Sequence, residues 1–426
     1  MSKDPSLAHL VDYLAHGDGS TPALRWADTS LTVSLKGLSD DARMLAAARA
    51  ALDIWTEATG ITFEQVRTNA DISFGNGEGG AFAELNYTAR GEMIHAHVNV
   101  AENWMNGFPA DQRWGVGDYG LQTFIHEIGH ALGLNHAGSY NGQGSYEQDA
   151  IFAKDTWKWS IMSYFDQRSD GSQIDYFISF PAVADVAAID QLYGPAKIRE
   201  GHDVYTMETL LDLQNKGTFT LVDTGGVDRF DFRGFKDGAF IDMRGGGFST
   251  LGGKPNDFAV ALGTKIENAI GSDATDSFTG NTADNLLNGG GYNDYLIGGD
   301  GNDTLIGGGG NFMPGLKIGD DLTGGAGEDV FVFVKAHHLD ADRIRDFEAG
   351  VDIIKLKKID ADTTAVGRQA FDFIGTDGFG GNAGELRYEI AKGGTLVTGD
   401  IDGDGAADFR LELMRKMDLS AADFVL

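Results

Sequence analysis

The first half of the chain alternates between helical and strand-like patterns of apolar residues. Apolar positions recur at helical spacing over residues 39–59, with Ser39 or Asp40 as the predicted N-cap and Gly60 as the stop. A second helix is predicted over Ala182–Tyr193, just before Gly194. Shorter apolar runs between these helices predict strands at 61–66, 71–74 and 94–100. The pattern is typical of a mixed α+β domain.

A nine-residue period replaces this pattern further along. Residues 298–306 (GGDGNDTLI) and 324–332 (GGAGEDVFV) match G-G-x-G-x-D-x-U-x, and weaker copies begin at 289, 280 and 271. Residues 307–323 number 17, which fits one unit with an eight-residue insertion, Phe312–Gly319. Position eight of the six units is always apolar: Phe278, Leu287, Leu296, Leu305, Leu322 and Phe331. This fixed phase favours stacked strands of a parallel β-roll over a flexible Gly-Asn-rich linker.

Composition adds a chemical explanation for the repeats. The chain has 61 Gly among 426 residues, no Cys and a net charge of −31. Clustered positive charge is missing, which argues against nucleic-acid binding, and the lack of Cys excludes a disulfide scaffold. Gly permits tight turns that aim carbonyl oxygens inward, and Asp adds carboxylates, so the repeats favour several structural Ca²⁺ ions. The excess acid is shared, with −14 in residues 1–196 and −17 in 197–426, so part of it is solvated surface.

These shifts predict two domains. We place the first at residues 1–196 and the second at 197–426, the latter with repeats over 271–332 and a β-sandwich cap over 333–426. No run of 18 apolar residues occurs, so no transmembrane segment is expected. The first residues also lack the apolar core of a secretory signal peptide.

Residues 126–138 (HEIGHALGLNHAG) carry the strongest chemical signal. His126 and His130 share one helical face, Glu127 lies beside them, and a chain turning at Gly133 can bring back His136 as a third ligand. The spacing H-E-x-x-H-x-x-G-x-x-H is that of metzincin zinc peptidases, and three unrelated core histidines are the weaker interpretation. One catalytic Zn²⁺ is predicted, with Glu127 as the general base for a water that attacks a peptide carbonyl.

Met162 lies downstream of His136, within Ser-Ile-Met-Ser-Tyr. Metzincins place a Met-containing turn beneath the metal, which favours that role for Met162 over ordinary core filling. Tyr164 follows two residues later, where a phenol can reach the metal or a developing oxyanion.

Taken together, these motifs resemble the serralysin family over nearly the whole chain. The resemblance implies an α+β metzincin catalytic domain, followed by an all-β domain with a parallel RTX β-roll and a β-sandwich cap. It implies a broad-specificity zinc endopeptidase that acts on protein and peptide substrates, with Tyr164 as a catalytic, switchable further ligand. Residues 81–86 would form the edge strand that pairs with extended substrate.

The resemblance also implies calcium ligands on both sides of the first repeat. Before the roll they are Arg199, Asp203, Asp223, Gly225, Gly226, Asp228 and Glu267. Here His202 stands where the family has Asp, and Asp203 is the substitute. In and after the repeats they are Asp276, Gly289, Gly290, Asp294, Gly298, Gly299, Gly301, Asp303, Gly307, Gly308, Gly310, Asp320, Gly324, Gly325, Gly327, Asp329 and Asp342.

Serralysins leave the cell through a type I ABC exporter that reads a C-terminal signal, which Asp423–Leu426 resembles. The resemblance therefore implies a secreted monomer that meets a periplasmic protease inhibitor. The competing hypotheses are a secreted RTX adhesin with an inert protease domain and an RTX pore-forming toxin, for which the apolar helical region is missing. Residues 400–408 (DIDGDGAAD) fit an EF-hand-like loop and a polar hairpin turn equally well.

Overall fold

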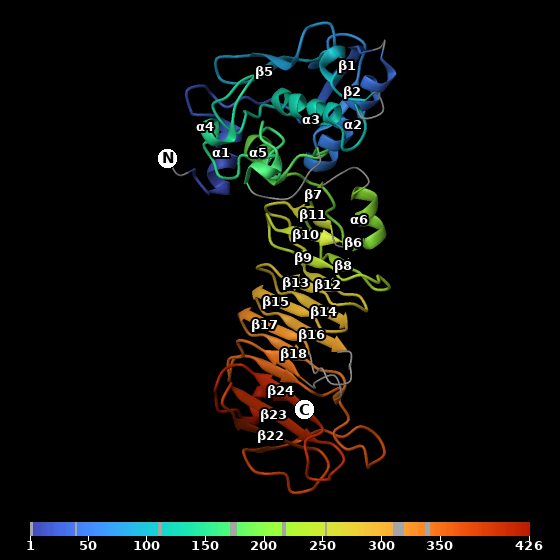
Figure 1. Cartoon of the computed structure of the whole chain (residues 1–426), viewed down its shortest axis with the longest axis vertical. Helices are drawn as coiled ribbons and strands as arrows, with labels where there is room; N and C mark the ends of the chain where they lie inside the picture. Colours follow the sequence, from blue (N-terminus) through green and yellow to red (C-terminus); the bar gives the residue numbers. More distant parts are fainter. Residues whose placement is uncertain are drawn as a thin grey trace. The chain divides into compact units, whose positions relative to one another are not determined.

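The computed structural model describes residues 3–38, 41–109, 113–170, 177–214, 219–251, 254–309, 319–336 and 341–426. The chain forms two compact units (Figure 1). The first unit comprises Met1–Glu200, Leu210–Thr224 and Asn256–Thr264, and the second comprises Gly201–Thr209, Gly225–Pro255 and Lys265–Leu426. The chain passes between the units more than once, so no single residue separates them.

The first unit packs helices against a five-stranded sheet. Its helices are α1 (Leu7–His16), α2 (Ala42–Thr59), η1 (Glu102–Met105), α3 (Tyr119–Ala131), α4 (Tyr146–Asp149), η2 (Gln167–Asp170) and α5 (Val183–Tyr193). Its strands are β1 (Ser30–Gly37), β2 (Thr62–Gln65), β3 (Ile72–Gly75), β4 (Ala81–Tyr87) and β5 (Met93–Val100), in the order β2-β1-β3-β5-β4. The strands are parallel except that β4 is antiparallel to β5. Strand β4 is therefore the predicted edge strand, and helix α3 contacts both β4 and β5.

The predicted helices are present, with one correction. Helix α2 starts at Ala42, and its N-cap is Asp41, whose carboxylate accepts the backbone N–H groups of Arg43 and Met44. The predicted caps were therefore wrong; Ser39 and Asp40 lie outside the described residues. An Asp cap at position 41 satisfies two of the donors that every helix leaves unpaired at its start.

Most elements of the second unit are short strands. They are β6 (Val204–Thr206), β8 (Arg229–Asp231), β9 (Phe240–Asp242), β10 (Phe248–Leu251), β12 (Asn268–Ile270), β13 (Ser277–Thr279), β14 (Leu286–Gly291), β15 (Tyr295–Asp300), β16 (Thr304–Gly309), β17 (Asp321–Ala326), β18 (Val330–Val332), β19 (Asp342–Ile344), β20 (Ile353–Lys355), β21 (Asp372–Gly375), β22 (Glu385–Ile390), β23 (Thr395–Asp400), β24 (Phe409–Leu413) and β25 (Phe424–Val425), with η4 at Ala421–Asp423. The boundary between the units falls within α6 (Met207–Gln214) and within β11 (Lys254–Val260), and β7 (Phe219–Leu221) belongs to the first unit.

Successive nonapeptides go to opposite sheets. One sheet has the order β21-β22-β23-β24-β19-β17-β15-β13-β9-β10 in this unit, and the other has β25-β20-β18-β16-β14-β12-β8-β6. Parallel neighbours come from alternate repeats, as in Leu287 of β14 beside Leu305 of β16. Leu296 of β15 pairs with Leu322 of β17, a step that exceeds two repeats by the length of the predicted insertion. The pairing thus confirms that insertion, although positions 310–318 lie outside the described residues.

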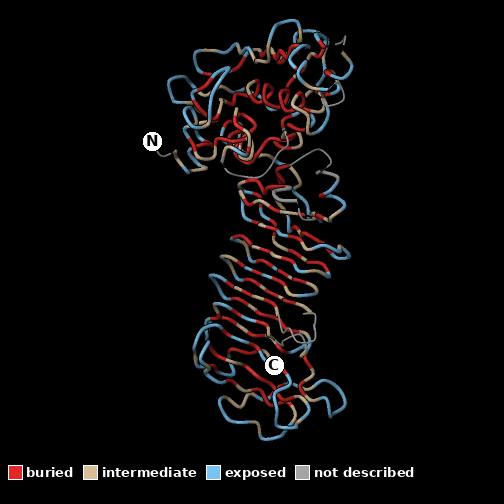
Figure 2. Tube along the Cα trace, viewed as in Figure 1, coloured by how far each residue is buried: buried red, intermediate tan, exposed pale blue. Residues whose placement is uncertain are grey.

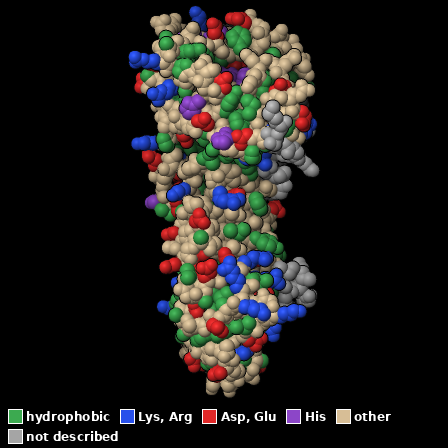
Figure 3. Space-filling model, turned by 90° about the vertical axis from the view of Figure 1, so that its left-hand side faces the viewer, with side chains coloured by type: hydrophobic (Ala, Val, Ile, Leu, Met, Phe, Trp, Pro, Cys, Tyr) green, Lys and Arg blue, Asp and Glu red, His purple; other side chains and the backbone are tan. Residues whose placement is uncertain are grey.

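All six predicted position-eight side chains are fully buried. Figure 2 shows buried positions recurring along the stacked strands of the second unit. The prediction of a parallel β-roll is confirmed. Over the face drawn in Figure 3, acidic side chains are scattered among basic and apolar ones and do not gather in one patch. None of the helices in the described ranges is long and apolar enough to cross a bilayer.

Candidate active site and carboxylate ladder

Helix α3 and the turn after it bring the three predicted histidines together. One ring nitrogen of each of His126, His130 and His136 lies within 4.8 Å of the others, and Nε2 of His130 is 2.9 Å from Nε2 of His136. The helix ends at Ala131, and Gly133 follows with φ +103°, where a Cβ atom would lie 2.0 Å from the Leu24 carbonyl oxygen. Only glycine fits this turn, which returns the chain to His136.

Backbone carbonyls fix the tautomers of two of these rings. Nδ1 of His126 donates to the Ile161 carbonyl at 2.8 Å, and Nδ1 of His130 donates to the Leu134 carbonyl at 2.8 Å. Each Nε2 is thereby left as a lone-pair donor toward the common centre, the arrangement that metal-ligating histidines adopt. Burial lowers the pKa of His126 to about 3 and that of His130 to about 4, so both rings are neutral at physiological pH. The donor set fits one Zn²⁺ with an open position.

The turn that contains Met162 packs against helix α3 beside the histidines. Met162 is fully buried, and a Cβ atom on Gly129 of α3 would lie 2.5 Å from its sulfur. Glycine at position 129 therefore lets the thioether pack against the helix between two of the histidines. This contact explains why the helix tolerates a glycine in its interior, where it costs about 1 kcal/mol relative to alanine.

Asp185 holds the Met162 turn in place from α5. Its buried carboxylate accepts the Ser160 hydroxyl at 2.6 Å, the Ile161 N–H at 2.7 Å and the Ala182 N–H at 2.8 Å. Burial raises the pKa of Asp185 to about 7, and the three hydrogen bonds oppose that shift. Because the Ile161 carbonyl orients His126, Asp185 positions a ring it does not touch. Asp185 begins a run, Asp185–Gly194, that contributes to the family resemblance, but the sequence alone assigned it no role.

Glu127 and Tyr164 lie beside the histidines. Glu127 is buried on α3, and burial raises its pKa to about 8. Tyr164 is half-buried, its ring centre lies 4.6 Å from that of His136, and its hydroxyl accepts the Gly142 N–H at 3.2 Å. The Tyr140 ring centre lies 4.7 Å from that of Tyr164 with the two planes tilted by 39°, and Tyr140 donates its hydroxyl proton to Asp155 at 2.7 Å. The Tyr140 ring, anchored by Asp155, therefore packs against the Tyr164 ring and limits its movement.

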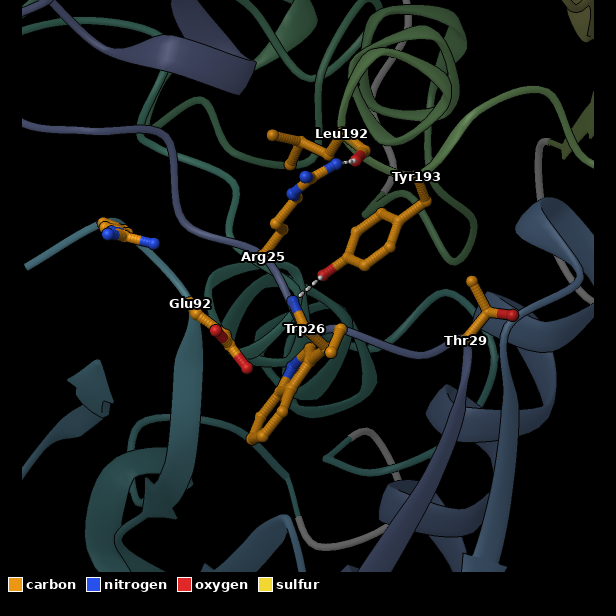
Figure 4. Close-up of a pocket in the computed structure, with 8 residues that line it drawn as sticks. Arg25, Trp26, Thr29, Glu92, Leu192 and Tyr193 are labelled. Atoms are coloured by element: carbon orange, nitrogen blue, oxygen red, sulfur yellow. Dashed lines mark hydrogen bonds between the residues drawn. The ribbon is translucent and has the colours of Figure 1, made fainter. Parts of the chain in front are cut away.

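A cavity of about 470 Å³ in the same unit adjoins the C-terminal end of α3 (Figure 4). Its Trp26 donates from the indole nitrogen to the Ala131 carbonyl at 2.8 Å, and Tyr193 donates to the Leu132 carbonyl at 2.7 Å. The Trp26 backbone N–H in turn donates to the Tyr193 hydroxyl at 3.2 Å. These side chains satisfy carbonyl groups that the helix end leaves open, which fixes the helix that carries His130.

Aspartates of the repeats form a ladder along each sheet. Asp276 N–H donates to Asp294, Asp294 N–H to Asp320, and Asp320 N–H to Asp342, at 2.7–2.9 Å. On the other sheet the corresponding acceptors are Asp303, Asp329 and Asp352. In each pair Oδ1 of the later aspartate faces the preceding turn of the same sheet.

The second oxygen of several ladder aspartates has no protein partner. Among the described residues, Oδ2 of Asp294, Asp303 and Asp320 is buried without a hydrogen bond. Burial, reinforced by neighbouring carboxylates, raises the pKa of Asp294 to about 9 and that of Asp303 to about 7. A buried unpaired carboxylate is costly, so these oxygens need a proton or a cation.

Glycine at position one leaves room beside each of these oxygens. A Cβ atom on Gly289, Gly298, Gly307 or Gly324 would lie 2.1–2.2 Å from Oδ2 of the aspartate that follows in its turn. The glycines at positions two and four have positive φ: Gly290, Gly299, Gly301, Gly308, Gly325 and Gly327. Oxygen-lined cradles of this kind fit Ca²⁺.

Some predicted repeat ligands differ from this pattern. Asp276 has both oxygens engaged, since Oδ1 accepts from Ala239 and Oδ2 accepts from the backbone and hydroxyl of Ser272. Gly310 lies outside the described residues. Asp346, which accepts the N–H groups of Gly324 and Gly325, was missed, as was Asp352. Parallel pairing of β18 with β20 is the signal that would have found Asp352.

The predicted ligands before the roll form a smaller cluster in the second unit. Asp228 accepts the Asp203 N–H at 2.7 Å and donates its own N–H to Glu267 at 2.8 Å. Gly226 has φ +134° and would carry its Cβ atom 1.6 Å from the Gly201 carbonyl oxygen. His202 accepts the Val227 N–H at 2.8 Å.

The other predicted pre-roll positions border this cluster along the chain. Asp223 is buried at the end of a segment of the first unit, and Gly225 begins the next segment of the second. The Arg199 guanidinium pairs with Glu57 at 3.1 Å and donates to the Val222 carbonyl at 2.7 Å. Arg199 can therefore offer a cation only its backbone carbonyl.

Residues 401–408 connect β23 and β24 as a hairpin loop, as one of the two interpretations predicted. Carboxylate oxygens of Asp400, Asp402 and Asp404 lie within 4.8 Å of one another. Asp400 is fully buried, and its two oxygens accept the N–H groups of Gly403 and Gly405.

A helix with two histidines and a glutamate, a third histidine brought back by the following turn, and a methionine turn define a metal-dependent peptidase of the metzincin class. Two family models match the chain, one described as Matrixin over residues 25–143 and one described as Peptidase M10 serralysin C terminal over residues 182–426. Metalloprotease AprA of Pseudomonas entomophila (strain L48) is 37% identical, across 85% of this chain and 75% of that protein. Serralysin of Proteus mirabilis is 36% identical, across 86% of this chain and 79% of that protein.

Among solved structures, the AlgE6R3 subunit of the Azotobacter vinelandii mannuronan C5-epimerase is 28% identical. The match covers 37% of this chain and 80% of that chain with a TM-score of 0.26, too low to establish a common fold. The family assignment rests on the sequence matches and the site. The chain belongs to the serralysin family and is a zinc metalloendopeptidase.

Proposed function

We propose that His126, His130 and His136 hold the catalytic Zn²⁺ and that Glu127 is the general base. The convergence of the three imidazoles, two with Nδ1 bonded to a carbonyl, is the observation that supports this assignment. When bound, zinc supplies Lewis acidity at this centre.

The surrounding residues would transfer the proton, stabilise the oxyanion and bind the substrate. Glu127 accepts a proton from the attacking water and delivers it to the leaving amine. The Tyr164 hydroxyl donates a hydrogen bond to the oxyanion as it develops, after leaving the Gly142 N–H. Edge strand β4 offers unpaired backbone groups beside α3, so an extended peptide adds to the sheet there and lies across the site.

Glu127→Gln tests the base. We expect peptide hydrolysis to fall by roughly 10²–10⁴-fold while the zinc content per chain stays that of the unaltered enzyme. Glu64→Gln, an exposed carboxylate on β2, is the matched control and should keep full activity. A fully active Glu127→Gln enzyme would sink the assignment, and an inactive one that has also lost zinc would assign Glu127 a structural role. A casein zymogram with and without a zinc chelator separates a protease from an adhesin with an inert domain.

We further propose that the carboxylate ladders bind several Ca²⁺ ions, which replace the protons that buried Asp294 and Asp303 otherwise need. Binding sites of this kind fill at the calcium concentrations found outside cells, which supports a secreted enzyme that folds after export. Loss of β-signal in circular dichroism on calcium removal is the expected result. An unchanged spectrum in chelator would count against calcium as the structural ion.

Export by a type I ABC machinery follows from the resemblance alone. In the folded chain, Asp423 accepts the Gly350 N–H and β25 pairs with β20, so the proposed signal is part of the fold. Recognition of this segment therefore requires an unfolded chain. Deleting the last dozen residues should abolish secretion, and unaffected export would exclude this route.

A further inference from the structure

Two histidines outside the active site converge on one serine. Nε2 of His95 lies 3.1 Å from Oγ of Ser73, and Nδ1 of His97 lies 2.9 Å from the same atom. A single hydroxyl therefore bridges the two imidazole rings. All three side chains are half-buried.

Strand geometry places this cluster on the outer face of the sheet. Along β5, Ala96 and Val98 are fully buried, so the alternating His95 and His97 point to the opposite face. Ser73 on β3 is the direct partner of His97. A Cβ atom on Gly75 would lie 3.1 Å from the His97 ring, so glycine there makes room for the imidazole.

A carboxylate on the neighbouring strand β4 lies next to the two histidines of β5. Glu84 of edge strand β4 is the direct partner of His97, and Asn86 is the direct partner of His95. Directly opposed residues on an antiparallel pair project from the same face with Cβ atoms about 4.5–5.5 Å apart. Glu84 is exposed, and its side chain can swing over the neighbouring ring.

The Ser73 hydroxyl has three acceptors within reach, the two rings and the Ala96 carbonyl at 3.4 Å, and its single proton goes to one of them. An uncharged imidazole always keeps one ring nitrogen with a lone pair, which is the atom that a metal ion binds. A cation that displaced the Ser73 hydroxyl proton would meet two imidazole nitrogens, and the exposed Glu84 side chain would have to turn toward them to add a carboxylate oxygen. Imidazole suits Zn²⁺, Cu²⁺ and Ni²⁺, and two His with one carboxylate is a ligand set that holds Zn²⁺ in metalloenzymes.

We propose that His95, His97 and Glu84 form a second, solvent-facing site for a divalent transition metal ion, distinct from the active site and from the carboxylate ladders. A bound ion would tie β5 to edge strand β4 through side chains, in addition to the backbone ladder. The remaining coordination positions face solvent and hold water.

Calorimetric titration of Zn²⁺ into the full chain, already loaded with one Zn²⁺ and saturated with Ca²⁺, tests the site. We expect one further equivalent to bind, and to be lost in His95→Gln/His97→Gln. The control His9→Gln/His16→Gln removes two imidazoles from α1 and should retain the further equivalent. Absence of that equivalent in the unaltered enzyme, or its persistence in the His95/His97 variant, would overturn the proposal.

Two further readouts protect the test from a folding artefact. Glu84→Gln changes only an exposed side chain, and it should weaken the further equivalent; unchanged affinity would remove Glu84 from the ligand set. Hydrogen exchange of the β4 amides should slow on Zn²⁺ addition in the unaltered enzyme but not in the His95→Gln/His97→Gln variant. Equal slowing in both would place the additional ion elsewhere.

Discussion

Replacing Gly299 by alanine is expected to destabilise the second unit by about 3 kcal/mol or more. Gly299 occupies position two of a nonapeptide with φ +120°, and a Cβ atom there would lie 2.3 Å from the Asn281 carbonyl oxygen. The dihedral alone costs an L-residue about 1–2 kcal/mol. The clash adds to that because its partner is backbone held in the preceding turns, not a flexible side-chain tip.

Two other glycines separate these contributions. Gly350 has φ +81° with no atom within 4 Å of an added methyl group, so Gly350→Ala carries the dihedral cost alone, about 1 kcal/mol. Gly378 has neither a positive φ nor a close neighbour, so Gly378→Ala should be neutral or stabilise by about 0.4–1 kcal/mol.

Thermal unfolding followed by circular dichroism in saturating calcium measures the series. Unfolding entropy of about 2.1 cal/mol/K per residue over about 200 residues converts about 3 kcal/mol into a shift of about 7 °C. The midpoints should rank Gly378→Ala above Gly350→Ala, with Gly299→Ala lowest. Equal midpoints for Gly299→Ala and Gly350→Ala would refute the close approach of successive turns.

Three other outcomes follow from the buried carboxylates. Asp352→Asn should raise the calcium concentration for half-maximal folding by roughly tenfold, because Asp352 orients Asp329; an unchanged calcium titration would remove Asp352 from the ladder. Burial raises the folded-state pKa of Asp294 to about 9 and of Asp303 to about 7, so the calcium-free roll gains stability from bound protons at low pH and loses it as pH rises through 7 to 9. Thermal midpoints of calcium-depleted protein should therefore fall between pH 5 and pH 9, excess calcium should suppress the fall, and a flat profile without calcium would contradict the burial argument. Asp185→Asn removes one acceptor oxygen from the Ser160 hydroxyl and the Ile161 N–H, which should lower the free energy of unfolding by about 1–3 kcal/mol and speed the loss of zinc. Unchanged zinc retention would show that the Met162 turn does not depend on Asp185.

The parts of the molecule that sequence predicted well share one property: their signal is local. The histidine spacing, the glycine at position 133 and the nine-residue phase each fit within a few turns of chain. Even the insertion could be inferred by counting, because parallel pairing preserves the phase on both sides of it.

The features that sequence missed depend on distant pairing. The step from Asp329 to Asp352 is longer than two repeats, so the repeat phase no longer marks Asp352, and only the β18–β20 pairing aligns it. Asp185 acts through Ser160 and Ile161, which lie 25 and 24 residues earlier in the chain, so the contact appears only in the folded structure. The convergence of His95 and His97 on Ser73 likewise requires the register of β3 against β5.

The alternation of nonapeptides between two sheets constrains how this family can change length. Neighbours within a sheet are two repeats apart, as for Leu287 and Leu305, so removal of one repeat would send every later strand to the opposite sheet. Strands β19 and β20 would then exchange partners, and the cap could no longer pair as it does. Rolls of this kind should therefore gain or lose repeats in pairs over evolution. An insertion whose length is not a whole pair of repeats can persist only as a loop that leaves the strand order unchanged. The eight-residue insertion between β16 and β17 is of this kind.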